Sequence, residues 1–230
     1  MKKILLLFVL FIGLSAQANE ITVSNVTLDN LWNKLGVREE KVNFVGSKLL
    51  NANKISKRIV FNVNSFSSVN ASAKYSNKIV TVNKGTFNYI DNDDELAAIL
   101  AHEIAHGVDY YGGFGKSLAM TFNSKSYEYE ADLTGIDYMV NAGYNPVAMI
   151  TVLNKICGES IWDWGILWSH PKTSSRLLKC YEYIYKKYPK YLSSDMTKNV
   201  FYVNWMNTAQ KDVSKFQQKE KERAAKRGSL

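Results

Sequence analysis

The chain has 230 residues, of which 46% are hydrophobic and 22% charged, enough apolar material for the core of one domain. Three prolines and the lack of any low-complexity run exclude a disordered chain. The net charge of +8 favours either simple solubility or contact with an anionic membrane or envelope surface. The sequence contains no nucleic-acid-binding motif, so we expect no nucleic-acid partner.

Residues 1–18 are typical of a secretory signal peptide. Lys2 and Lys3 precede an apolar stretch and an Ala-Gln-Ala cleavage site. The stretch is shorter than the roughly 20 residues that cross a hydrocarbon core, so we expect cleavage and a mature periplasmic chain without a transmembrane segment. In that oxidising compartment Cys157 and Cys180 would either form a disulfide or stay as buried thiols.

Strands are expected in the first half of the chain, after an initial helical segment. Apolar residues recur at helical spacing over residues 19–57. Residues 58–64, 69–75 and 79–82 carry β-branched or alternating apolar residues, which predict three strands. Together they indicate a small, largely antiparallel sheet.

Helices are expected from residue 91 onward. Asp and Asn at residues 91–94 suit a helix N-terminus, and an apolar face follows at Leu96, Ile99, Leu100, Ile104 and Val108. The helices lie over residues 95–111 and 124–141, after Asn145 and after residue 171, with a basic helix or tail over residues 201–230. The expected organisation is one domain over residues 19–200 followed by this C-terminal segment.

The most informative motif is HExxH at residues 102–106, which holds two of the chain's three histidines. A helix turns about 100° per residue, so His102 and His106 are offset by roughly 40° and share one face. Two imidazoles on one face can bind Zn²⁺, and Glu103 beside them can act on a metal-bound water. The pattern therefore predicts a zinc hydrolase.

A catalytic zinc site needs a third protein ligand. Gly112 occupies the position where the HExxHxxGxxH pattern requires a histidine, so we expect a carboxylate from another helix. Glu128 and Asp132 are four residues apart and share a face, whereas Glu130 points elsewhere. Glu128 is the expected ligand, and Asp132 would accept a hydrogen bond from a ligand imidazole.

Several motifs in the same order resemble the HtpX-like and CaaX-prenyl-protease family of zinc metallopeptidases, in its compact secreted form. They are Asn70-Ala71, residues 94–106, residues 128–135, residues 142–146, and His170-Pro171 with Arg176. The resemblance implies an α+β, zincin-like (gluzincin) fold that is mostly helical, with a small, largely antiparallel sheet packed on the HExxH helix. It also implies one zinc ion per chain.

The resemblance implies roles for further residues. It agrees with the spacing that Glu128 is the third ligand. It places His170 near the cleft, where this residue would stabilise the oxyanion or reach the zinc as a plug; the alternative is a turn residue that caps the next helix. Arg176 would pair with a carboxylate or remain a surface cation. An extended substrate would pair with the edge strand that starts at Asn70 and Ala71.

We therefore expect a zinc-dependent endopeptidase that hydrolyses unfolded or misassembled envelope proteins, and its quality-control role follows from the resemblance alone. The alternative is an envelope holdase or assembly factor with weak or latent peptidase activity. The basic C-terminal segment and a cluster of Trp162, Trp164 and Trp168 would serve that second function.

Overall fold

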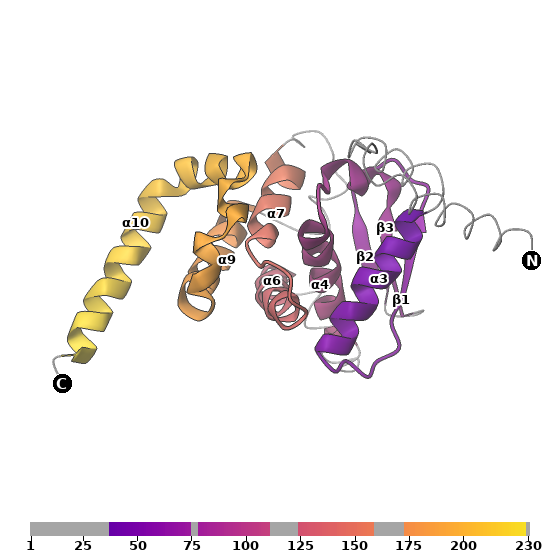
Figure 1. Cartoon of the computed structure of the whole chain (residues 1–230), viewed down its shortest axis with the longest axis horizontal. Helices are drawn as coiled ribbons and strands as arrows, with labels where there is room; N and C mark the ends of the chain where they lie inside the picture. Colours follow the sequence, from indigo (N-terminus) through magenta and orange to yellow (C-terminus); the bar gives the residue numbers. More distant parts are fainter. Residues whose placement is uncertain (1–36, 75–77, 111–123, 159–172, 229–230) are drawn as a thin grey trace, which may run out of the picture. The chain divides into compact units, whose positions relative to one another are not determined.

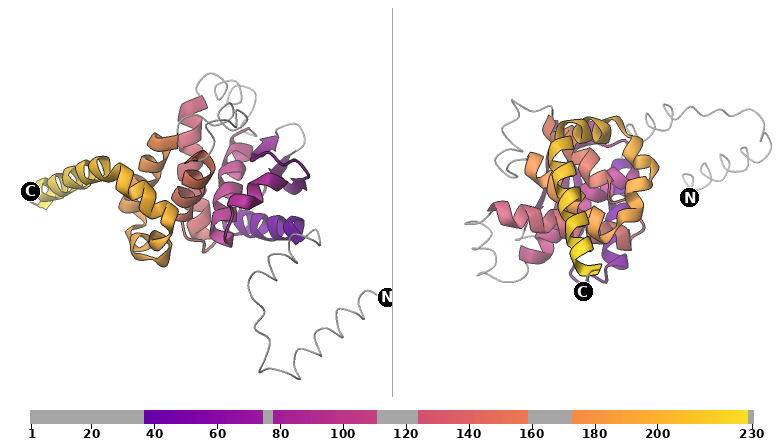
Figure 2. Two further views of the ribbon diagram at one scale, coloured as in Figure 1. Left: turned by 90° about the horizontal axis from the view of Figure 1, so that it is seen from above. Right: turned by 90° about the vertical axis from the view of Figure 1, so that its left-hand side faces the viewer.

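Helix α4 (Asp93–Tyr110), which carries the HExxH motif, lies between a three-stranded sheet and the helices α6 (Ser124–Asn141) and α7 (Ala148–Gly158) in the computed structural model (Figures 1 and 2). The structure describes residues 37–74, 78–110, 124–158 and 173–228. Residues 39–230 form one compact unit. Helix α3 (Val37–Ala52) begins two residues before this unit, and all other described elements lie within it. The signal-peptide region at residues 1–18 lies outside the described residues.

The other elements confirm a mostly helical chain with a small sheet. Helix α10 (Val200–Gly228) occupies the segment for which a basic helix or tail was expected. The remaining bounds are α3 (Val37–Ala52), β1 (Val60–Asn64), β2 (Ala71–Lys74), β3 (Ile79–Asn83), η1 (Lys84–Tyr89), α9 (Thr173–Lys187), η2 (Pro189–Ser193), η3 (Asp195–Lys198) and α10 (Val200–Gly228). Among the described residues, none of the helices combines the length and apolarity that crossing a bilayer requires.

The prediction of a largely antiparallel sheet is wrong, because the sheet is mixed. Its strand order is β1-β3-β2, with β1 parallel to β3 and β2 antiparallel to β3. The central strand β3 carries the buried Val80 and Val82. Strands that follow one another in sequence usually pair as neighbours, but here the chain passes from β1 to the opposite edge of the sheet before it forms β2. Strand β2 is therefore an edge strand.

The segment that crosses from β1 to β2 is fixed by η1. Gly85 donates its backbone N–H to the Phe66 carbonyl at 3.0 Å. A side chain at Gly85 would place its Cβ 1.9 Å from the Ser67 carbonyl oxygen, so only glycine permits this approach. The Thr86 hydroxyl accepts the Asn70 N–H at 2.9 Å and donates to the Asn70 carbonyl at 2.8 Å. These contacts set the position at which β2 begins.

The N-terminus of α4 is closed by the residues that the sequence indicated. The side chain of Asn92, the N-cap residue, accepts the Glu95 N–H at 3.0 Å, and the Glu95 carboxylate accepts the N–H of the preceding residue, Asp91, at 2.8 Å. Glu95 also binds Lys155 of α7 at 2.6 Å and the Thr151 hydroxyl at 3.0 Å. Glu95 and Lys155 are both buried, so this ion pair joins α7 to the start of α4.

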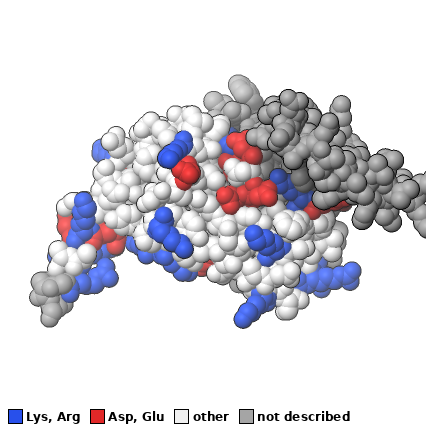
Figure 3. Space-filling model, in the orientation of Figure 1, with Lys and Arg blue, Asp and Glu red and all other residues white. Residues whose placement is uncertain are grey.

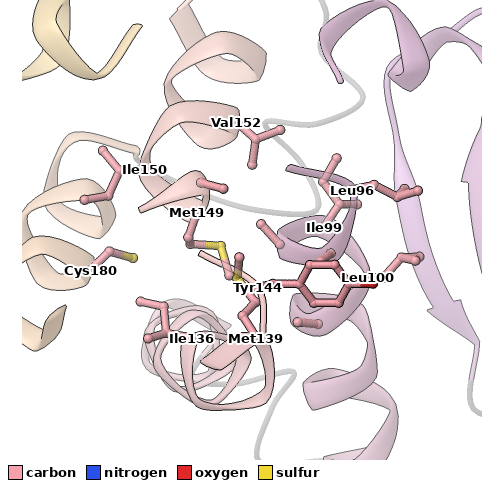
Figure 4. Packing of buried hydrophobic residues seen from close by; sticks show 14 of the residues in the cluster. Leu96, Ile99, Leu100, Ile136, Met139, Tyr144, Met149, Ile150, Val152 and Cys180 are labelled. Carbon is pink, nitrogen blue, oxygen red and sulfur yellow. The ribbon is translucent and has the colours of Figure 1, made fainter. Parts of the chain in front are cut away.

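The core lies where helices α4, α6 and α7 meet (Figure 4). The expected apolar face of α4 is confirmed, with Leu96, Leu100 and Ile104 fully buried. These side chains pack with Met139 of α6 and with residues of α7 and α9 in one cluster. Cys180 of α9 belongs to the same cluster and is a free, buried cysteine, whereas the side chain of Cys157 lies outside the described residues.

We expect Lys155→Met to lower the free energy of unfolding by about 3–5 kcal/mol, because it leaves the buried Glu95 carboxylate with only Thr151 and a backbone N–H. Urea denaturation of the purified protein measures this loss. The matched control Lys198→Met breaks an exposed pair with Asp195 and should leave the midpoint unchanged. Equal midpoints for the two variants would contradict a stabilising role for the buried pair.

Candidate metal centre

Three side chains from two helices converge on one point. His102 and His106 of α4 and Glu128 of α6 each offer a ligand atom, and these atoms all lie within 4.8 Å of one another. The two Nε2 atoms are 3.1 Å apart. Glu128 Oε2 is 3.4 Å from His102 Nε2, and Glu128 Oε1 is 3.1 Å from His106 Nε2. All three residues are buried.

These separations suit a tetrahedral ion. Zinc binds imidazole nitrogen and carboxylate oxygen at roughly 2.0–2.2 Å, which places neighbouring tetrahedral ligands about 3.3 Å apart. The two Nε2 atoms, 3.1 Å apart, agree with that spacing, and each lies 3.1 or 3.4 Å from one of the two carboxylate oxygens of Glu128. Two imidazoles and one carboxylate also leave a fourth position for water, as catalytic zinc requires. The residues therefore fit a metal ion of this kind.

A close contact between α4 and α6 brings the three residues together. Gly135 lies on α6, and a Cβ at this position would be 3.2 Å from the backbone nitrogen of His102 and 3.3 Å from the carbonyl carbon of Ala101. Glycine thus lets the two backbones approach more closely than any other residue would. Glu128 and Asp132 precede Gly135 along the same helix and so reach the two histidines.

Behind the ligands lies a second carboxylate, Asp132. Its Oδ1 is 2.9 Å from His102 Nδ1, and the Arg176 guanidinium of α9 binds it in a bidentate manner at 2.7 Å for both contacts. A proton on Nδ1, held by Asp132, leaves the lone pair of Nε2 for the metal. Arg176 also lies 3.1 Å from Glu128, so one cation orients both carboxylates.

The charges of this cluster favour a bound cation. Burial opposes the charged form of His102, but hydrogen bonds with Asp132 and Glu128 raise its pKa to about 10. Burial likewise opposes ionisation of Asp132, but Arg176 and His102 hold the pKa of this carboxyl below its ordinary value. One Arg176 guanidinium faces two carboxylates, so the imidazoles sit in a net negative field. A metal ion at Nε2 would supply the positive charge that this field stabilises.

A pocket opens beside the cluster. It is lined by Glu103 and His102 of α4, by Ala71, the first residue of β2, and by Asn70, which precedes it. Glu103 is buried and directly follows His102 in the sequence. The cavity is therefore shared by the residues expected to bind substrate, by the expected base Glu103, and by His102, a candidate metal ligand.

Most of the site residues predicted from sequence meet at this centre. Arg176 pairs with carboxylates and is not a surface cation, and Glu130 is exposed. His170 and the cluster of Trp162, Trp164 and Trp168 lie outside the described residues.

Sequence reasoning missed the apolar wall that α7 adds to the pocket. That wall consists of Met149, Val152, Leu153 and Ile156. It also missed the hydrogen bond of 2.7 Å between the Tyr129 and Ser175 hydroxyls, which joins α6 to α9 next to Glu128 and Arg176. Nothing in the spacing of these residues distinguishes them from ordinary core positions.

The chain is similar in sequence to known proteins. The model of a family described as Peptidase family M48 matches residues 37–110 and 111–183. A Beta-barrel assembly-enhancing protease from Yersinia pestis is 27% identical over 180 residues, covering 59% of this chain and 37% of the relative. The protein of the same name from Escherichia coli (strain K12) is 25% identical over 179 residues, with the same shares. The chain thus spans little more than a third of the length of these curated relatives.

We expect Gly135→Ala to weaken metal binding on the order of 10-fold, because the new methyl group forces α6 away from the α4 backbone. Metal content after dialysis against a graded chelator measures the change. Gly107→Ala is the matched control on α4, since its Cβ would meet only side-chain atoms at 3.7 and 3.8 Å. This control should keep its metal, and identical metal loss in both variants would refute the role given to the helix contact.

Proposed function

The chain belongs to peptidase family M48, and on this premise we propose that it is a zinc-dependent endopeptidase of the gluzincin type. The observation that carries the proposal is the convergence of His102, His106 and Glu128, whose ligand atoms lie within 4.8 Å of one another, with Glu103 on the adjoining pocket. The metal would be zinc, because two imidazoles and a carboxylate with one open position form a typical catalytic zinc site.

The residues of the site divide the chemistry among them. Zinc, when bound, polarises the scissile carbonyl and lowers the pKa of a water molecule toward about 7. Glu103 accepts the proton of the attacking water and delivers it to the leaving amine. Asp132 keeps the Nδ1 proton on His102, and Arg176 holds Asp132 and Glu128 in position. These two residues therefore position the ligands.

The edge strand supports an extended substrate. Strand β2 has a neighbour on one side only within the described sheet, and its first residue, Ala71, lies at the pocket that contains Glu103. A peptide that pairs with β2 by backbone hydrogen bonds would place a peptide bond beside the base. Such pairing requires an unfolded segment, so unfolded or misassembled proteins are the proposed substrates.

The cell envelope is the proposed location. The pattern of residues 1–18 favours export to the periplasm, and the curated relatives are named for enhancing β-barrel assembly. The proposed organisation is the signal peptide, a peptidase domain over residues 19–200 and the C-terminal segment over residues 201–230. His170 keeps its proposed role at the cleft through the family resemblance, supported by the place of Arg176 six residues later.

Helix α10 supports a peripheral contact with an anionic envelope surface. Its last turns carry exposed Lys and Arg side chains, and in Figure 3 these are mixed with acidic side chains at the end of the helix. Exposed cations of this kind are attracted to anionic lipid over about a Debye length. The contact would bring the protein to its substrates.

We expect Glu128→Ala to lose bound zinc, because it removes one of three protein ligands. Glu130→Ala is the matched control two residues away, and its side chain is exposed. Zinc measured by inductively coupled plasma mass spectrometry should fall from one ion per chain to nearly none in the first variant only. Full zinc content in Glu128→Ala would refute the ligand assignment.

We expect Glu103→Gln to retain zinc and to cleave casein about 10²- to 10⁴-fold more slowly, because an amide cannot accept the water proton. The same variant distinguishes the peptidase from the alternative holdase. A peptidase requires Glu103 for cellular function as well as for cleavage. Retained cellular function in a variant that does not cleave would favour the holdase or assembly factor.

A further inference from the structure

A second hollow, which shares no residue with the metal centre, lies between the end of α9 and the last turns of α10. Four of its seven lining residues are cationic and one, Glu220, is acidic. The cations are Lys186 of α9 and Lys221, Arg223 and Arg227 of α10. A single carboxylate cannot balance four cations, so the hollow carries a net positive charge. Figure 3 shows basic side chains at this end of α10, with acidic ones among them.

Helix α10 rests on α9 just before the hollow opens. Phe216 of α10 is buried, and its ring meets the Tyr185 ring edge-on at a centroid distance of 5.4 Å. From residue 218 to residue 227 none of the residues is buried. The last turns of α10 therefore expose their side chains to solvent beside α9.

Helical spacing explains why two arginines share the hollow. Positions i, i+3, i+4 and i+7 lie on one face of a helix, and here they are Glu220, Arg223, Ala224 and Arg227. All four line the hollow, so this face is the one that α10 presents to it. Ala224 ends at its methyl group and leaves the space between the two arginines open.

Glu220 holds one cation from each helix at the hollow. Its Oε1 lies 3.4 Å from Lys186 Nζ and 2.6 Å from Arg223 Nη1. The Glu220 side chain is 15% exposed, whereas those of Lys186 and Arg223 are 48% and 62% exposed. The carboxylate is thus largely covered, and the two cations that bind it still reach solvent. It fixes their positions for an external anion.

This set of donors fits a phosphate group at a surface. Arginine guanidinium groups bind phosphate oxygens in a bidentate manner, and lysine adds a point charge. A protein partner would need an apolar core to its interface, and residues 218–228 contain no large apolar side chain. For the same reason the end of α10 lacks the apolar face that enters the acyl region of a bilayer. The contact therefore belongs to the headgroup layer.

We propose that this hollow binds the phosphate of an anionic lipid headgroup through Lys186, Arg223 and Arg227. The inference rests on the proposed contact of α10 with an anionic envelope surface, and it names the ligand and the residues that bind it. It is independent of the peptidase activity, because the hollow contains none of the candidate metal ligands.

Co-sedimentation of the purified protein with vesicles tests the site. The wild type should bind vesicles of phosphatidylcholine mixed with phosphatidylglycerol and should not bind phosphatidylcholine alone. Arg223→Gln/Arg227→Gln should raise the Kd for the anionic vesicles by about 30-fold, since each cation near an anionic surface contributes about a factor of 5. Lys211→Gln/Lys215→Gln removes the same charge from exposed positions on another face of α10 and should raise the Kd by less than about 3-fold.

Ala224→Glu is a second variant that keeps every cation. It fills the hollow with a carboxylate, and glutamate is a good helix former. This variant should also weaken binding to the anionic vesicles, by about 10-fold. Circular dichroism melting shows that each variant folds, and casein cleavage should be the same in all of them.

The outcomes separate this inference from the proposed function. Equal losses in the two double variants would overturn the headgroup site and leave a contact based on overall charge. No binding of anionic vesicles by the wild type would overturn the envelope contact and the site together. Binding of polyglutamate or inorganic phosphate without binding of vesicles would assign the hollow to an acidic protein segment or a soluble anion instead. Site-dependent vesicle binding by a wild type that does not cleave casein would support the site and overturn only the peptidase.

Discussion

The buried Asp132 carboxylate is the interaction on which the site depends. It lies on α6, contacts His102 of α4 at 2.9 Å and accepts two hydrogen bonds from Arg176 of α9 at 2.7 Å. A buried carboxylate is costly unless it is paired, and here its partners are a candidate metal ligand, His102, and the guanidinium of Arg176, which also contacts Glu128. The same contacts fix the protonated nitrogen of His102 and the orientation of Glu128. Three helices are thereby joined at the point where the chemistry takes place.

Packing provides the second constraint. Gly135 allows α6 to meet the α4 backbone next to His102, and the Glu95–Lys155 pair joins α7 to the first turn of α4. The active helix is thus held by α6 at its centre and by α7 at its start. A site whose ligands are held by buried neighbours needs little rearrangement when a metal ion binds, which is the condition for precise catalysis. The apolar wall of α7 follows from the same attachment.

The sequence predicted the parts of this centre that obey local rules. Helical spacing placed His102 and His106 on one face, and the same geometry separated Glu128 and Asp132 from Glu130. It left the role of Arg176 open, because a single cation with no local partner has no periodic signature. It also gave no indication of Lys155, whose partner Glu95 is sixty residues away in the chain.

The sequence predicted the strands of the sheet but not their order. Alternation of β-branched residues indicates a strand, and all three strands were expected near their observed positions. The order of the strands depends on the segment that crosses from β1 to β2, whose backbone passes Gly85 closely at Ser67. No local sequence pattern indicates that these two residues meet. A default of sequential antiparallel pairing therefore missed the parallel β1–β3 pair. Likewise the pocket wall of α7 consists of ordinary core residue types, so only the structure shows that it lies beside Glu103.

We propose that this buried, charged cluster holds one zinc ion through His102, His106 and Glu128. X-ray absorption spectroscopy of the zinc-loaded protein reports the identity and distance of the metal's neighbours. We expect one zinc per chain with four nitrogen and oxygen neighbours at about 2.0–2.1 Å, including two imidazoles. Sulfur neighbours, a single imidazole, or failure to bind zinc at all would contradict it.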